Sequence, residues 1–483
     1  MRRIGHPRIP MSATILPLQL VDFEHYMLVD DEHDYPMVIP VWLRFDGILN
    51  RDRLVATFKK TVEANPLLRA IVENREQAKG GTPELFWVST DKRPVFEWTD
   101  QLPEMVKFDL FQEPGLRVFA KEENGQMEIR LFVHHCVSDG VGITQMVEQW
   151  LTEYQNSLPN SPSSNAKLQN EKPVSTNPAN ERNANLANRG KFGMNFWKYL
   201  LRPFQEFCGL IGAVEYFSHR PVAIGPQEMD LDSHPEQHHS HQLQILEFSE
   251  EETAQILQAS KSTGNKVNDM MVAAIFEACH QWLVDHHPEE AERHLRVIIP
   301  INMRNRKQPE SFVANVVSMT YLDRRPGRYK SIASICRYAW LEMTAIKMMN
   351  LGLTLIHIIR YFRKRGKLQK LLRRDRSIAS ITFSNLGRVF NDSPMADADR
   401  QVSVDGVHLK SFHFFPPIRP YTWISTSAVT YAKRLMINCN WCSRALSRSD
   451  AEQILTRFKH NLLTGFSNNS SENETEMNLA GSK

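Results

Sequence analysis

The segment VHHCVSDG at residues 133–140 contains two adjacent histidines, and an Asp-Gly pair follows the second histidine after three further residues. The preceding run MEIRLFV, at residues 127–133, alternates as a half-buried strand does. The following run GITQMV, at residues 142–147, is typical of the start of a helix. We therefore expect both histidines at the end of a strand, where a rigid scaffold can present side chains to a cleft.

The histidines and the aspartate of this segment can carry acid–base chemistry. An imidazole accepts a proton from a hydroxyl or amine near neutral pH, and a nearby carboxylate can hold the backbone or a cation in place. Gly140 permits a turn that a Cβ would hinder. The structural alternative is that His134 and His135 are satisfied polar residues at a strand end and that Asp139 caps the next helix.

The pattern His-His-x-x-x-Asp-Gly resembles the signature of the chloramphenicol-acetyltransferase-like superfamily. That superfamily includes peptide-synthetase condensation domains, plant BAHD acyltransferases and bacterial wax ester synthase/diacylglycerol acyltransferases. The resemblance covers residues 15–465, and Asn65 departs from it where a histidine is usual. The plant family's Asp-Phe-Gly-Trp-Gly segment is missing, so wax ester or polyketide-associated acyltransferases are the nearer resemblance. The other similar segments are residues 16–23, 47–69, 108–118, 267–274, 299–304, 314–317 and 383–387.

The resemblance implies an α/β fold of two chloramphenicol-acetyltransferase-like layered lobes, with a tunnel between them and the histidine motif midway. It also implies that the motif residues His134, His135, Asp139 and Gly140 belong to the catalytic site. His135 would be the general base. Asp139 would pair with Arg304 and so hold the histidine loop in place.

The implied reaction is direct acyl transfer from a thioester, either acyl-CoA or an acyl carrier protein, to a small hydroxyl acceptor without an acyl-enzyme. Ser384 and Asn385 are the candidate donors to the developing oxyanion. We expect no bound cofactor and no metal. Two alternatives remain: a condensation-type enzyme that forms amides between carrier-bound substrates, and a catalytically silent binding protein of the same fold.

Length and composition favour two globular domains. The chain has 483 residues, of which 42% are hydrophobic and 23% charged, and its net charge of +3 does not suggest a nucleic-acid partner. No secretory signal is recognisable near the start, so we expect a cytoplasmic monomer. The expected units are an N-terminal lobe (14–154), a disordered linker (155–190), a connecting or interfacial helical segment (191–240), a C-terminal lobe (241–466) and a disordered tail (467–483).

Two segments raise the question of a membrane or an anionic partner. Residues 196–217 are aromatic and partly basic, and they fit either an interfacial helix or a helix packed between the domains. A basic run at residues 360–376 follows an apolar segment, and within it Arg363, Lys364 and Arg365 are candidate contacts for an anion. The anion could be a phospholipid at the inner membrane face, a coenzyme A phosphate or an acidic carrier protein. The alternative is a solvated helix face.

The six cysteines show little patterning. Only Cys439 and Cys442 are closely spaced, and one such pair is weak support for a zinc site. Cys136, inside the histidine motif, is interpreted as a packing residue rather than a nucleophile.

Overall fold

A computed structural model of the chain describes residues 15–75, 84–159, 178–192, 202–229, 241–304, 312–372 and 375–466. Within these residues the strands form two six-stranded sheets and one three-stranded sheet. The strand order is β12-β13-β2-β7-β6-β5 in the N-terminal sheet, β10-β9-β11-β14-β15-β8 in the C-terminal sheet, and β1-β4-β3 in the small sheet. The two large sheets with their covering helices confirm the predicted α/β fold of two lobes.

The N-terminal sheet contains β2 (Val38–Phe45), β5 (Val95–Trp98), β6 (Leu116–Glu123), β7 (Gln126–His134), β12 (Ser403–Val404) and β13 (Val407–Phe414). The C-terminal sheet contains β8 (His241–Glu247), β9 (Leu295–Asn302), β10 (Val317–Arg324), β11 (Ile381–Arg388), β14 (Ile424–Tyr431) and β15 (Arg434–Cys442). The small sheet contains β1 (Leu18–Gln19), β3 (Ala70–Arg75) and β4 (Glu84–Ser89).

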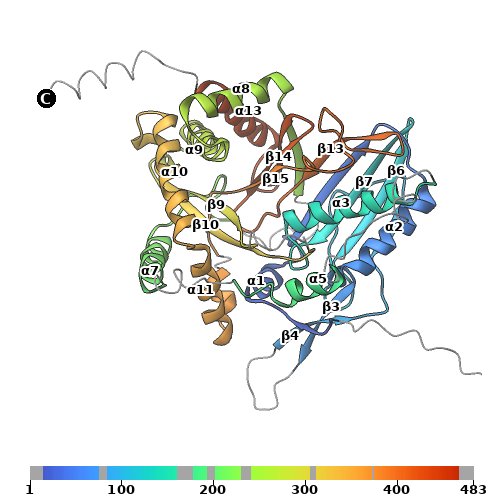
Figure 1. Cartoon of the computed structure of the whole chain (residues 1–483). Coiled ribbons are helices and arrows are strands. Elements are labelled where there is room, and N and C mark those ends of the chain that lie inside the picture. The colour runs from blue at the N-terminus through green and yellow to red at the C-terminus, as the bar shows by residue number, and fades with distance from the viewer. Residues whose placement is uncertain are drawn as a thin grey trace, which may run out of the picture.

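Helices cover the sheets on their outer faces, as Figure 1 shows. Helices α2 (Arg51–Ala64) and α3 (Gly140–Asn156) pack together on the N-terminal sheet. The C-terminal sheet carries α8 (Glu250–Thr263), α9 (Val267–His286), α10 (Ile332–Met348) and α13 (Arg448–Thr464). Helices α1 (Asp22–Asp30), α11 (Gly352–Lys364) and α12 (Leu368–Leu372) pack against one another.

The central strand β7 explains how the histidine motif is carried. Met127, Ile129 and Leu131 are buried on one face, as the alternating sequence predicts. Near its C-terminal end both faces of the strand are buried, since Phe132 and His134 are also fully buried, and β2 and β6 pair with its two edges. The motif therefore leaves the sheet from a rigid, desolvated position.

One strand crosses between the lobes. β13 pairs antiparallel with β2, with Phe412 opposite Leu43 and Phe414 opposite Val41, although β13 lies within residues 241–466. The sequence assigned all of that range to the C-terminal lobe, and the structure corrects this for β12 and β13. An alternating strand pattern does not reveal which sheet edge the strand will join.

The segment predicted to be a disordered linker is partly ordered. Residues Pro178–Ala187 form helix α5, and the guanidinium of Arg189 makes two hydrogen bonds of 2.6 and 2.8 Å to the carboxylate of Glu24 on α1. Both side chains are almost completely buried, and Trp87 Nε1 donates to the same carboxylate at 3.0 Å. The segment has too few apolar residues to form a core, but the buried ion pair of Arg189 with Glu24 fixes its C-terminal end against α1. Residues 160–177 and the tail 467–483 lie outside the described residues.

Helix α7 (Arg202–Ser218) occupies part of the predicted connecting or interfacial segment, on the outer side of α11 in Figure 1. Its outward residues Phe207, Leu210 and Val214 are each about 60% exposed. The aromatic residues 196–201 lie outside the described residues. Among the helices that are described, none has both the length and the hydrophobicity needed to cross a bilayer.

Candidate functional site

The site begins where β7 ends at His134 and α3 begins at Gly140. The five residues between them form a tight connection that Asp139 closes as the N-cap of α3, with its carboxylate accepting from the backbone N–H of Gly142 at 2.9 Å. The predicted strand, loop and helix are therefore present at the expected residues.

His134 points into the protein. Its side chain is fully buried, its Nδ1 accepts from the backbone N–H of Cys136 at 3.1 Å, and its Nε2 lies 3.4 Å from a carboxylate oxygen of Asp31. These contacts fix the turn after the strand. The geometry supports a structural role for His134 within the motif.

His135 faces a cavity between the two large sheets. Its backbone N–H donates to the carbonyl of Met37 at 2.7 Å, and the side-chain amide of Asn315 donates to the carbonyl of His135 at 2.6 Å. The same Asn315 nitrogen lies 3.4 Å from Nδ1 of the ring. In the tautomer whose proton is on Nδ1, the free lone pair is on Nε2. The cavity has a volume of about 140 Å³ and is lined by residues of both lobes.

The electrostatic environment keeps His135 neutral. Burial lowers its pKa below the usual imidazole value, and hydrogen bonding to the backbone and the charge of Asp139 offset this only in part. A neutral ring has a free lone pair at neutral pH. His135 can therefore accept a proton from a group bound in the cavity.

Asp139 is fully engaged by the protein. One of its oxygens accepts from Gly142, and the other accepts from the backbone N–H of Val316 and from Arg304 Nη1, both at 2.7 Å. Burial raises the pKa of Asp139, but the charge of Arg304 and these hydrogen bonds outweigh it, and the pKa lies below its ordinary value. Arg304 also donates to the carbonyl of Ala314 at 2.8 Å. The structure thus brings together the two residues that the sequence paired, and their contact joins the histidine loop to the C-terminal lobe.

Gly140 has a steric reason to be glycine. A Cβ at this position would lie 2.5 Å from Leu386 Cδ2 on β11 and 2.9 Å from Phe414 Cζ on β13. Both contacts come from the second half of the chain. Gly140 therefore allows the start of α3 to approach β11 of the C-terminal sheet and β13 closely.

Ser384 and Asn385, the candidate oxyanion donors, lie on β11 and line the same cavity as His135. The amide of Asn385 is already used: its oxygen accepts from Gly387 N–H at 2.8 Å, and its nitrogen donates to Asn268 at 3.1 Å. Of the two, Ser384 is the better candidate to donate to a substrate oxygen.

Sequence reasoning missed Asn315. It treated residues 314–317 only as one of several similar segments, yet Asn315 supports His135 through two contacts. The sequence signal was weak: Asn315 is a polar residue among the apolar residues Val313, Ala314, Val316 and Val317, and a polar side chain that is buried needs hydrogen-bond partners.

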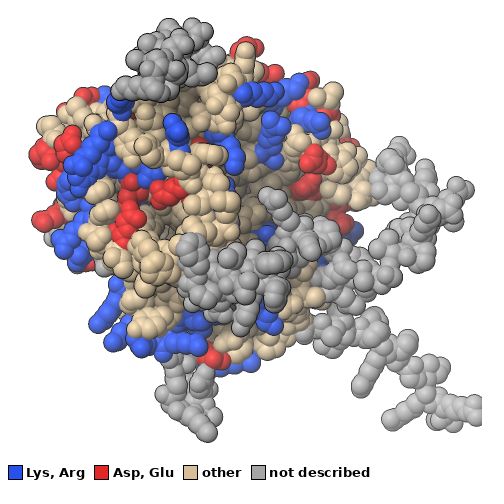
Figure 2. Space-filling model, turned by 60° about the vertical axis from the view of Figure 1, so that its left-hand side comes forward, with Lys and Arg blue, Asp and Glu red and all other residues tan. Residues whose placement is uncertain are grey.

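Part of the basic run contacts the protein itself, and the predicted contact with an anion stays a prediction. Arg360 and Arg363 donate to the two carboxylate oxygens of Asp22, at 2.7 and 2.9 Å, and Arg365 stacks over Tyr361. Arg363 is therefore partly committed inside the protein because the carboxylate of Asp22 is nearly buried, whereas Lys364 and Arg365 remain exposed. Figure 2, which brings forward the side with α7, α10 and α11, shows Lys and Arg gathered along the lower margin of a largely uncharged area. Arg373 and Arg374 lie outside the described residues.

The cysteines have structural surroundings. Cys439 and Cys442 are both buried in β15, and Cys136 Sγ lies 3.3 Å from the carbonyl of Glu24. Burial raises the pKa of the Cys136 thiol far above its usual range. Within the described part of the chain, His, Cys, Asp and Glu side chains form no cluster that could hold a metal ion.

Three cavities adjoin at the site. The cavity of His135 shares Phe23 and Val317 with a second cavity of about 270 Å³ between α1, α5 and α11. It shares Tyr26, Ile298, Met319 and Ile378 with a third cavity of about 350 Å³ beneath α7. The two larger cavities therefore lie next to the cavity of His135.

Comparison of the fold identifies similar solved structures. The first condensation domain of the CDA synthetase is 14% identical, with a TM-score of 0.61 over 94% of this chain and 97% of that chain. The chain has the condensation-domain fold. Trichothecene 15-O-acetyltransferase from Fusarium sporotrichioides is 10% identical, with a TM-score of 0.62 over 93% and 95% of the chains. The starter condensation domain of rhizomide synthetase in complex with C8-CoA is 12% identical, with a TM-score of 0.60 over 94% and 95%. No family model and no curated protein matches the sequence. These neighbours agree with the fold that the resemblance implies.

Proposed function

We propose that this protein is an acyltransferase that moves an acyl group from a thioester, acyl-CoA or acyl carrier protein, to a hydroxyl acceptor. The observation that carries the proposal is the position of His135, a neutral imidazole on a cavity between the lobes, in a loop held by the ion pair of Asp139 and Arg304. A general base in a cavity between the lobes can act on an acceptor bound beside it.

The proposed reaction needs no covalent intermediate on the protein. The acceptor O–H gives its proton to Nε2 of His135 while the acceptor oxygen attacks the carbonyl carbon of the thioester. The C–S bond of the tetrahedral intermediate then breaks, and the imidazolium returns the proton to the leaving thiolate. The Ser384 hydroxyl, on the wall of the same cavity, would donate to the oxyanion.

The cavity between α1, α5 and α11 supports a donor that carries phosphate. Its described lining residues include four cations, Arg189, Lys191, Arg360 and Arg363, and one carboxylate, Asp22. Arg189 is paired with Glu24, and Arg360 and Arg363 share Asp22, so the region keeps a net positive charge. Asn315, which contacts His135, also lines this cavity. A phosphopantetheine arm that enters here would bring its thioester toward the base while its phosphate stays near the cations.

The test is release of free thiol from acyl-CoA and acyl carrier protein donors incubated with a panel of alcohols and amines. We expect release with alcohols in the wild type and none above background in His135→Ala. Release with amines and not with alcohols would favour the condensation-type alternative. If every donor and acceptor failed with folded protein, the acyltransferase proposal would be wrong and a binding role would replace it.

A further inference from the structure

The cavity beneath α7 is the largest of the three, and its lining is mainly apolar. Its walls come from α7, from β9 and β10, and from α10 and α11. Aliphatic and methionine side chains dominate the part that faces α10 and α11, including Ile346, Met349, Leu355 and Ile358. A cavity of 350 Å³ lies within the range of small-molecule sites in proteins.

Small residues on the inner face of α7 leave this space open. Gly209, Gly212 and Ala213 line the cavity at the spacing that places residues on one face of a helix. A Cβ on Gly209 would lie 2.3 Å from Thr354 Oγ1, so α7 contacts α11 closely there, whereas a Cβ on Gly212 would meet only Tyr321 Oη at 3.8 Å. There is therefore room for a side chain at Gly212, and the glycine leaves that room to the cavity. Glycine within a helix costs about 1 kcal/mol relative to alanine.

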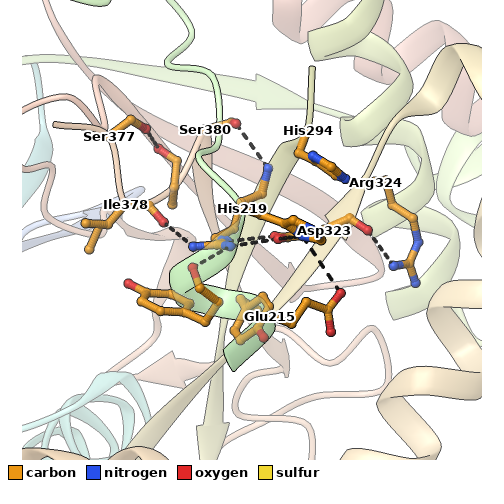
Figure 3. A network of polar contacts seen from close by, with 12 residues as sticks. Glu215, His219, His294, Asp323, Arg324, Ser377, Ile378 and Ser380 are labelled. Carbon is orange, nitrogen blue, oxygen red and sulfur yellow. Dashed lines mark hydrogen bonds and ion pairs between the residues drawn. The ribbon is translucent and has the colours of Figure 1, made fainter. Parts of the chain in front are cut away.

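A buried polar network holds α7 as a fixed wall. Arg296 pairs with Asp323 through contacts of 2.6 and 2.7 Å and donates to the carbonyl of Tyr216 in the last turn of α7 at 3.1 Å. His219, just after α7, lies 3.1 Å from the Asp323 carboxylate, as Figure 3 shows. Arg296 is fully buried, and a cation near the carbonyl end of a helix is favourable.

The polar groups at the edge of the cavity are occupied by the protein. The Tyr321 hydroxyl donates to the carbonyl of Gly212, and Glu342 accepts from Arg324 at 2.7 Å. A polar ligand would have to compete with these contacts. An apolar ligand would gain free energy by contact with the aliphatic wall and with Met319 and Met349, whose side chains adapt to irregular shapes.

From these observations we propose that the cavity beneath α7 binds a long linear alkyl chain of a substrate whose reacting group lies at His135. The lining residues Tyr26, Ile298, Met319 and Ile378 belong to both cavities, so the two cavities are adjacent, and the proposal requires the chain to pass between these side chains. This inference rests on the proposed acyl transfer, and it names the substrate class as lipid. The alkyl chain could belong to the acyl donor or to the alcohol acceptor, and the experiments distinguish them.

Cys208 provides a test that does not depend on activity. All six cysteines lie in the described residues, and Cys208, which lines this cavity, is the one that is not buried. Alkylation of Cys208 by a maleimide is followed by mass spectrometry with laurate, with butyrate or with neither. At ten times its Kd, laurate should slow labelling about tenfold, because labelling then follows the unoccupied fraction. Butyrate should have little effect, and equal rates under all three conditions would overturn the proposal.

Variants of α7 and α10 show where the chain binds. Gly212→Leu and Ala345→Phe add side chains on opposite walls of the cavity, and both should abolish protection of Cys208 by laurate. Val214→Leu is the matched control, because Val214 is 62% exposed on the same helix and should leave protection unchanged. Circular dichroism and Tm identify any variant that fails to fold. Full protection in both folded cavity variants would contradict the assignment.

Turnover with two substrate series shows whether the bound alkyl chain belongs to the acyl donor or to the alcohol acceptor. Donors from acetyl-CoA to palmitoyl-CoA are tested with a short alcohol, and alcohols from ethanol to hexadecanol with acetyl-CoA. If Gly212→Leu removes long-chain preference in the donor series, the cavity holds the acyl chain, and loss in the acceptor series assigns it to the alcohol. Absence of turnover with intact protection of Cys208 would overturn the proposed acyl transfer and leave the alkyl site standing. Turnover with no protection and unchanged chain-length preference would overturn the alkyl site alone.

Discussion

At the scale of single residues, the two histidines of the motif have different surroundings and should respond differently to mutation. His135→Ala removes the proposed general base and should lower kcat by roughly 10²- to 10⁴-fold with little change in Tm. His134→Ala removes a buried acceptor for the Cys136 N–H and should lower the free energy of unfolding by about 1–3 kcal/mol, with a smaller loss of activity in the folded fraction. Kinetics and thermal denaturation of both variants check this. Equal, small losses of activity in the two variants would show that His135 is not the general base.

The pKa of His135 also predicts the pH profile. The base acts only when neutral, so activity falls as pH drops through its pKa. Burial lowers that pKa below the ordinary value, so the acid limb of kcat/KM should have its midpoint below about pH 6.5. A profile measured from pH 4.5 to 8 on stable protein tests this. A midpoint above pH 7 would contradict a desolvated, neutral imidazole.

Asp139 and Arg304 form a residue pair whose loss should be cooperative. The side chains are 5% and 11% exposed, so removal of one leaves the other charge uncompensated, at about 3–5 kcal/mol. Asp139→Ala and Arg304→Ala should each lower Tm and activity, and the double variant should lose less than the sum. Because the pKa of Asp139 is lowered on folding, its contribution is present above about pH 4 and is lost as pH falls through the folded pKa. Strict additivity in chemical denaturation would show that the two do not interact.

At the scale of elements, the cations in and just after helix α11 differ in whether they pair with a carboxylate of the protein. Arg360 and Arg363 neutralise Asp22, whereas Lys364 and Arg365 are exposed and remain candidates for an anionic surface or carrier. Lys364→Glu combined with Arg365→Glu should release the protein from anionic liposomes, or weaken carrier binding, without a change in Tm.

The control for this prediction is Arg363→Glu, which places a second carboxylate beside Asp22 and should lower Tm as well. Wild-type binding should fade between low salt and 0.5 M salt, because exposed charges are screened over about 10 Å at 0.1 M ionic strength. Sedimentation with vesicles and pull-down with a carrier protein measure it. If the wild type bound neither at low salt, the exposed cations would be a solvated face.

At the scale of the whole molecule, β13 makes the lobes interdependent. After β11 the chain leaves the C-terminal sheet, forms β13 beside β2, and returns to the C-terminal sheet at β14. The N-terminal sheet is therefore incomplete without residues 407–414. A fragment of residues 14–190 would expose the edge of β2, and an unpaired, apolar edge favours association. We expect this fragment to aggregate or to unfold without cooperativity. A soluble, monomeric fragment with a sharp thermal transition would contradict this.

The sequence by itself determined the strand–loop–helix around His135, the α/β class and, through the resemblance, the pairing of Asp139 with Arg304. These depend on local periodicity and on a short motif whose spacing is set by backbone geometry. Only the tertiary structure decided that β13 completes the other lobe's sheet, that Arg189 in the predicted linker is buried against Glu24, and that two cations of the basic run belong to Asp22. Each of these joins residues more than 150 positions apart. The partner of a strand edge or of a buried carboxylate is set by which groups the fold desolvates together, and local sequence patterns do not contain that information.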